Sequence, residues 1–167
     1  MFKLDTLRSR SSLRTVNVTS AASTVIFAMV YGIVEHTFLT SPLGIGILEY
    51  PLGIHLIGSI YFYHILLGLL AFLISFNPFF DVLLFSSNPV RKKNALLWGI
   101  GNIANFFWLE DMSYFVLFSE WPKDVMTPLH LSFYGVVWWY PVLFAGAATL
   151  YYMAARIGGS ERVQISH

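Results

Sequence analysis

Long apolar stretches dominate the chain, and short polar segments separate them. Four of these stretches are long enough to cross a bilayer, because a transmembrane helix needs ~20 mainly apolar residues. They cover residues 20–40, 51–76, 94–118 and 129–155. The connections carry Pro, Gly and Asn-Pro breaks, which are typical of turns. The pattern therefore predicts an all-α integral membrane four-helix bundle, formed by a single domain of residues 20–156.

The composition supports a membrane setting. Hydrophobic residues make up 56% of the 167 residues and charged residues only 11%, whereas soluble domains carry about 25% charged residues. A soluble fold of this size could not bury so much apolar surface. The chain has no cysteine, which excludes disulfides, thiolate metal ligands and a cysteine nucleophile.

The basic residues predict the orientation, because Lys and Arg concentrate in cytoplasmic segments of membrane proteins. Nine of the ten lie in or beside the segments that would share one side of the membrane: Lys3, Arg8, Arg10, Arg14, Arg91, Lys92, Lys93, Arg156 and Arg162. Lys123 lies in the last connection, on the other side. We therefore expect residues 1–19 and 157–167 to be cytoplasmic tails. The protein would span the plasma membrane, or another membrane that faces the cytoplasm, several times.

Two adjacent carboxylates, Glu110 and Asp111, interrupt the third apolar stretch in "NFFWLEDMSYF", residues 105–115. At ~1.5 Å per residue they lie roughly 10–13 Å below its outer end. A charge that faces lipid is costly, so acids in membranes turn inward and often mark functional sites. Asp111 points about 100° away from Glu110 on a helix. The two acids should therefore address two neighbouring helices or flank one site.

Further polar residues fall at a similar predicted depth. We expect one polar cluster in the outer half of the bundle, built from Glu35, His36, His55, Glu110, Asp111 and His130. Mixed imidazole and carboxylate ligands suit a transition metal ion such as copper, zinc or iron, so all six are candidate metal ligands. No HExxH or other fixed metal-binding spacing supports this. The structural alternative is a hydrogen-bond network that fixes the bundle, in which Asn102, Asn105 and Tyr31 bind the acids.

The aromatic residues of the last stretch have an ordinary interpretation. Trp138, Trp139 and Tyr140 lie in "VVWWYP", near the predicted outer boundary or somewhat deeper. Trp and Tyr are enriched at the interface between membrane and water. We therefore interpret these three residues as part of an interfacial aromatic belt.

The sequence "EDMSYF" followed by "PLHLSFYGVVWWYP" resembles the last two spans of the EXPERA family, which includes the emopamil-binding sterol isomerases. Members of that family are four-span proteins whose acids and histidines move a proton on a lipid substrate within the bilayer. This resemblance implies proton-handling roles for Asp111 and Glu35. It also implies a sterol-like lipid as substrate.

Three functions remain open, and the sequence does not decide whether the protein is an enzyme. The leading hypothesis is a site for a metal ion or polar ligand, in a subunit of a membrane redox complex. The first alternative is lipid- or sterol-directed acid/base isomerisation, with Glu110 or Asp111 as the catalytic general acid. The second is a non-catalytic accessory subunit. The expected partners are membrane lipids and other membrane subunits. Nucleic-acid binding has no support, because the basic residues are few and lie at membrane flanks.

Overall fold

The computed structural model is dominated by helices. It describes the backbone of residues 2–40, 55–57, 60–116, 132–133 and 136–164, and the side chains of residues 16–37, 64–115 and 137–158. The four long helices are α1 (Phe2–Thr40), α2 (Phe62–Phe76), α4 (Pro89–Val116) and α5 (Trp139–Gln164). The predicted all-α class with four helices is thereby confirmed.

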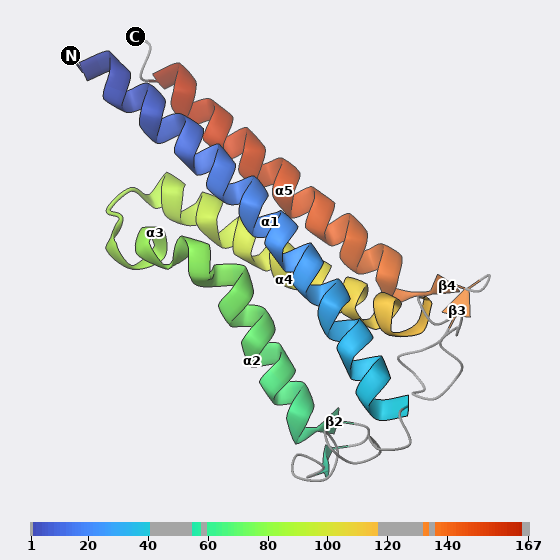
Figure 1. Ribbon diagram of the computed structural model, residues 1–167. Helices are drawn as coiled ribbons and strands as arrows, with labels where there is room; N and C mark the ends of the chain where they lie inside the picture. Colours follow the sequence, from blue (N-terminus) through green and yellow to red (C-terminus); the bar gives the residue numbers. More distant parts are fainter. Residues whose placement is uncertain (1, 41–54, 58–59, 117–131, 134–135, 165–167) are drawn as a thin grey trace.

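The four helices alternate in direction, so both ends of the chain lie at the same end of the bundle (Figure 1). We name this the terminal end and the opposite one the distal end. Helix α4 is central, because it packs extensively against both α1 and α5. Helix α2 packs mainly against α4 and makes few contacts with α1. The third predicted stretch thus organises the bundle.

Two of the long helices begin later than the apolar pattern predicts. Residues at the start of the second and fourth stretches form short antiparallel ladders: β1 (His55–Ile57) with β2 (Ile60–Tyr61), and β3 (Ser132–Phe133) with β4 (Val136–Val137). These segments are rich in β-branched and aromatic residues, which favour strands. Hydropathy shows how long an apolar stretch is but does not distinguish a helix from a strand. The apolar pattern therefore included these strands in the predicted helices.

The first helix, in contrast, begins earlier than predicted. Helix α1 starts at Phe2, so the segment predicted as a basic tail continues the helix of the first stretch. Charged residues do not interrupt a helix by themselves, because Lys and Arg have good helix propensity. The apolar pattern therefore located the candidate membrane-crossing part of α1 and not its first residue.

Proline and asparagine mark the break between α2 and α4. The 3₁₀ turn η1 (Asn77–Phe79) follows α2, and the short helix α3 (Phe80–Phe85) follows η1. Asn88 then caps α4, because its Oδ1 accepts hydrogen bonds from the backbone N–H groups of Val90 at 2.9 Å and Arg91 at 3.3 Å. Pro89 at the first helical position suits such a start.

The bundle is apolar outside and partly polar inside. Large apolar side chains on several helices are more than half exposed, among them Ile26, Val30, Leu69, Val142, Phe144 and Tyr152. Polar side chains such as Thr24, Ser75 and Asn102 are fully buried. Within the described residues, Val16–Thr37 and His64–Phe85 are long and apolar enough to cross a membrane. These features support membrane association.

An apolar core joins α1, α2 and α4. It contains Ala28, Leu67, Ala71, Phe106 and Leu109. The alanines allow the helix backbones to approach one another, as small residues do between membrane helices. This core lies beside the acidic residues of α4 and holds α1 against them.

Candidate functional site

The acidic residues gather near the distal end of the bundle. Glu35 of α1 and Glu110 of α4 are both buried, with 6% and 7% of their surface exposed. Their carboxyl groups lie within hydrogen-bonding reach of each other. An ionised carboxylate can only accept hydrogen bonds, so the two groups can share a hydrogen bond only when one of them is protonated. The pair is therefore arranged to share a proton inside the bundle.

Gly32 allows α1 and α4 to meet at this pair. A Cβ atom at Gly32 would collide with the backbone oxygen of Glu110 and with the Ser113 hydroxyl. The same hydroxyl donates a hydrogen bond of 2.9 Å to the Glu110 carbonyl. Glycine at this position lets the two backbones approach closely. Glu35 follows less than one turn later and reaches Glu110 across the contact.

The second acid of the pair faces α5. The hydroxyl of Tyr140 donates a hydrogen bond to Oδ2 of Asp111. Tyr140 is buried, with 5% of its surface exposed, and it is the second residue of α5. Asp111 also lies within electrostatic range of Glu110. The adjacent acids thus address two neighbouring helices, as their 100° offset on the helix predicts.

Tyr31 completes the surroundings of the carboxyl pair. It lies on α1, four residues before Glu35, and residues with that spacing share one face of a helix. Tyr31 is half-buried and lies within electrostatic range of both Glu35 and Glu110. Three acids and two phenols from three helices therefore form one site, which we name the carboxyl cluster: Tyr31, Glu35, Glu110, Asp111 and Tyr140. Such a group can hold and exchange protons.

The predicted histidines are placed only in part. His36 is buried on α1, and its ring packs edge-on against Tyr114 with a centroid distance of 4.9 Å. The backbone of His55 lies in β1, but its side chain and all of His130 lie outside the described residues. Among the residues described, no three His, Cys, Asp or Glu side chains are arranged to hold a metal ion. The metal site remains a prediction that depends on His55 and His130.

The alternative prediction is a hydrogen-bond network in which Asn102, Asn105 and Tyr31 bind the acids, and it is wrong about the two asparagines. Asn102 and Asn105 belong to a separate network, which we name the polar chain. In this chain, Trp108 Nε1 donates to Asn105 Oδ1 (2.9 Å), and Asn105 Nδ2 donates to the Tyr151 hydroxyl (2.9 Å). The Tyr151 hydroxyl then donates to Asn102 Oδ1 (2.8 Å), and Asn102 Nδ2 donates to Ser20 Oγ (2.7 Å). The chain joins α4, α5 and α1, and it fixes the bundle without using the acids.

Sequence reasoning missed Gly32 and misread Tyr140. The interfacial interpretation of Tyr140 assumed a helix from about residue 129, whereas α5 begins at Trp139. Tyr140 therefore enters the bundle in the first turn of the helix and reaches Asp111. The spacing of Gly32 and Glu35 on one helix gave a usable signal, because a small residue close to a buried acid marks a close helix contact.

Comparisons with protein-family models, with curated proteins and with solved structures found no match. The interpretation of the carboxyl cluster consequently depends on its own geometry and chemistry.

Proposed function

We propose that this chain is a multi-pass membrane protein whose carboxyl cluster performs acid/base chemistry on a lipid of the sterol or isoprenoid class. The observation that carries the proposal is the close approach of two buried carboxyl groups, those of Glu35 and Glu110. The proposal places both termini in the cytoplasm and the cluster in the outer half of the bilayer. It identifies Glu35 and Glu110 as the acid/base candidates.

Membrane insertion is supported by the distribution of side chains. The outer surface of the bundle carries exposed Ile, Leu, Val and Phe residues on all four long helices. Two described segments have the length and composition of membrane spans. Both termini lie at one end of the bundle (Figure 1), and the basic residues of the sequence belong mostly to that end. An even number of crossings explains why both termini lie at one end, and a cytoplasmic location of that end explains its basic residues.

The carboxyl pair suits a reaction that moves a proton within one substrate. Shifting a carbon–carbon double bond requires a proton to be added to one carbon and another to be removed from a neighbouring carbon. A carboxylic acid can donate the first proton, and a carboxylate can accept the second. The pair then returns to its starting charge with one proton, so no oxidant, reductant or further reactant is needed.

Asp111 and Tyr140 have a supporting role in this proposal. Their hydrogen bond fixes the start of α5 against α4, beside the carboxyl pair. A negative charge on Asp111 would also stabilise positive charge that develops on the substrate carbon, and such stabilisation is strong where water is excluded. We therefore assign Asp111 as a positioning and electrostatic residue, and not as the primary proton donor.

A metal site is the less supported interpretation of the same cluster. Glu110 lies against Glu35, and Asp111 accepts a hydrogen bond from Tyr140, but among the described residues no group of three His, Cys, Asp or Glu side chains could hold a metal ion. A metal ion would need further ligands from His55 or His130, whose side chains lie outside the described residues. Metal analysis of gently solubilised protein tests this directly. One equivalent of metal that is lost in both Glu110→Gln and His130→Ala would overturn the acid/base proposal.

Deuterium transfer from solvent provides the decisive test. Membranes that contain the protein are incubated in D₂O with a panel of unsaturated sterols and isoprenoids, and mass spectrometry measures carbon-bound deuterium in recovered lipid. We expect incorporation with the wild-type protein, and loss of at least ~100-fold in Glu35→Gln and Glu110→Gln, a usual contribution of general acid/base catalysis. Asp81→Asn, at an exposed position in α3, is the matched control and should retain activity.

A spectroscopic measurement separates loss of chemistry from loss of structure. A proton shared by the pair would give an infrared carbonyl band from a protonated carboxyl group, which Glu110→Gln should remove while circular dichroism shows unchanged helix content. Absence of this band in the wild-type protein would contradict the proposal. Equal deuterium incorporation in wild-type and Glu110→Gln proteins would also contradict it, and a stable large assembly with inert acids would favour an accessory subunit.

A further inference from the structure

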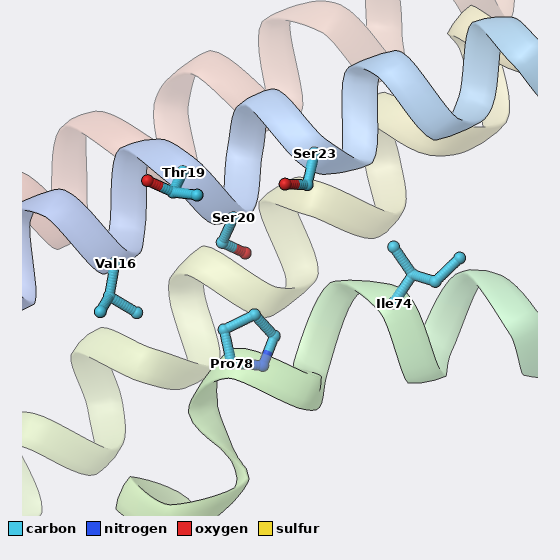
Figure 2. A pocket seen from close by; sticks show the side chains of 6 residues that line it. All are labelled: Val16, Thr19, Ser20, Ser23, Ile74 and Pro78. Carbon is cyan, nitrogen blue, oxygen red and sulfur yellow. The ribbon is translucent and has the colours of Figure 1, made fainter.

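A crevice separates α1 from the end of α2, far from the carboxyl cluster. It has a volume of about 290 Å³ and is lined by Val16, Thr19, Ser20, Ser23, Ile74 and Pro78 (Figure 2). Helices α1 and α2 make few contacts with each other. Ser20 precedes Glu35 by fifteen residues on α1, or roughly 22 Å at 1.5 Å per residue. The crevice is therefore a separate feature.

The two walls of the crevice differ in chemistry. Helix α1 contributes three hydroxyl-bearing residues, Thr19, Ser20 and Ser23, whereas Ile74 of α2 and Pro78 of η1 form an apolar wall opposite. Figure 2 shows the Ser20 side chain pointing from α1 toward Pro78. An occupant that matches both walls would have an apolar body and an oxygen on one side.

Ser20 is prepared to donate a hydrogen bond. It is 4% exposed, and its Oγ accepts a hydrogen bond of 2.7 Å from Asn102. A hydroxyl has one proton besides its acceptor sites, so the Ser20 proton can bind a further acceptor. The polar chain ends at this oxygen, and all its donors point in the same direction, from Trp108 toward Ser20. Aligned hydrogen bonds polarise one another, which makes Ser20 a stronger donor.

The depth of Ser20 indicates the kind of occupant. The last basic residue before the apolar part of α1 is Arg14, six residues before Ser20, so Ser20 lies near the boundary of the apolar region, roughly 9 Å along the helix from that charge. Membrane lipids place the oxygens that join head group and chain near this boundary. A donor that lacks an acceptor is costly in hydrocarbon. Lipid chains are the material that fills a gap between diverging helices in a bilayer.

Charge at the same end of the bundle indicates the head group. Helix α4 begins beside the terminal half of α1 (Figure 1), and its first five residues include Arg91, Lys92 and Lys93. Arg91 and Lys93 are exposed. Basic residues just outside the apolar region attract anionic lipid.

We propose that the crevice binds one anionic membrane lipid. One acyl or isoprenoid chain lies between α1 and the wall formed by Ile74 and Pro78. The oxygen at the junction of chain and head group accepts a hydrogen bond from Ser20, and the head group lies toward the basic start of α4. This inference depends on membrane insertion but not on the acid/base activity of the carboxyl cluster.

Photo-crosslinking tests the site in the full-length protein. The chain is reconstituted into nanodiscs of phosphatidylcholine and phosphatidylglycerol, with the phosphatidylglycerol carrying a diazirine on its chain, and peptide mass spectrometry locates the label after irradiation. We expect labelling concentrated on residues 16–23 and 74–78. Ser23→Leu should fill the crevice and remove most of this labelling. Ala22→Leu adds the same bulk at an exposed neighbour that does not line the crevice, and it should leave the labelling unchanged.

A second variant tests the hydrogen bond itself. Ser20→Ala should weaken retention of phosphatidylglycerol roughly fivefold, as expected for the loss of one neutral hydrogen bond, in native mass spectrometry at unchanged helix content. Equal labelling in wild-type and Ser23→Leu proteins would overturn the proposal. Labelling spread evenly over the apolar surface would also overturn it, as would equal labelling by diazirine-bearing phosphatidylcholine. Crosslinks between two copies of the chain at these residues would assign the crevice to a protein interface instead.

Discussion

Gly32 of α1 lies directly against the backbone carbonyl oxygen of Glu110 in α4. A Cβ atom at this position would collide with that oxygen and with the Ser113 hydroxyl. The contact sets the distance between α1 and α4 at the place where Glu35 meets Glu110. The carboxyl pair therefore depends on the absence of a side chain at a third residue.

Gly32→Ala tests this dependence. We expect the added methyl group to force the helices apart and to destabilise the protein by about 1–3 kcal/mol, as overpacking does elsewhere. Thermal unfolding in detergent measures the change, and the infrared band of the carboxyl pair should weaken with it. Gly68→Ala is the matched control, because a Cβ atom at Gly68 would meet nothing within 4 Å. Equal melting temperatures for the two variants would contradict the packing role of Gly32.

Tyr140→Phe tests the link between Asp111 and α5. The substitution keeps the ring and removes the hydroxyl that donates to Asp111. We expect a loss of about 1–3 kcal/mol in the free energy of unfolding, because the half-buried Asp111 carboxyl group loses the hydroxyl that donates to it. Tyr152→Phe removes the same atom from an exposed ring on α5, where 62% of the residue surface is accessible. That control should change stability by no more than about 0.5 kcal/mol.

Asn102 and Ser75 are both fully buried, yet we expect opposite responses when their polar groups are removed. The Asn102 side chain bonds to Ser20, to the Tyr151 hydroxyl and to the Ser75 carbonyl. Hydrogen bonds between membrane helices contribute about 0.6 kcal/mol each on average, so Asn102→Ala should cost roughly 1–3 kcal/mol. The Ser75 hydroxyl has no hydrogen-bond partner among the described residues, so Ser75→Ala should be neutral or stabilising.

Chemical unfolding of the two variants in mixed micelles gives this comparison. A larger loss for Ser75→Ala than for Asn102→Ala would show that the polar chain does not stabilise the bundle as described.

The absence of native cysteine makes the topology directly measurable. Single cysteines replace Ser9, Ser87, Ser119 and Ser160, and a membrane-impermeant maleimide is added to sealed vesicles of known orientation. We expect Ser9→Cys, Ser87→Cys and Ser160→Cys to react only from the cytoplasmic side, because basic residues flank all three positions. Ser119→Cys, beyond the end of α4, should react only from the opposite side. Reaction of Ser9→Cys and Ser160→Cys from opposite sides would exclude an even number of crossings.

The apolar pattern by itself determined the helical class, the approximate position of four helices and the angular separation of Glu110 and Asp111. These properties depend only on local composition and on the constant geometry of a helix. The position of Asn102 and Asn105 on one helix face was also readable, but their bonding to Tyr151 was not.

Only the tertiary structure decided which partners the acids have. Glu35 meets Glu110 because Gly32 lets α1 approach α4, and Tyr140 reaches Asp111 because α5 begins at Trp139 and not ten residues earlier. Both results depend on the distance and register between helices. Side chains from separate helices set these quantities together, and no local pattern in one helix contains them.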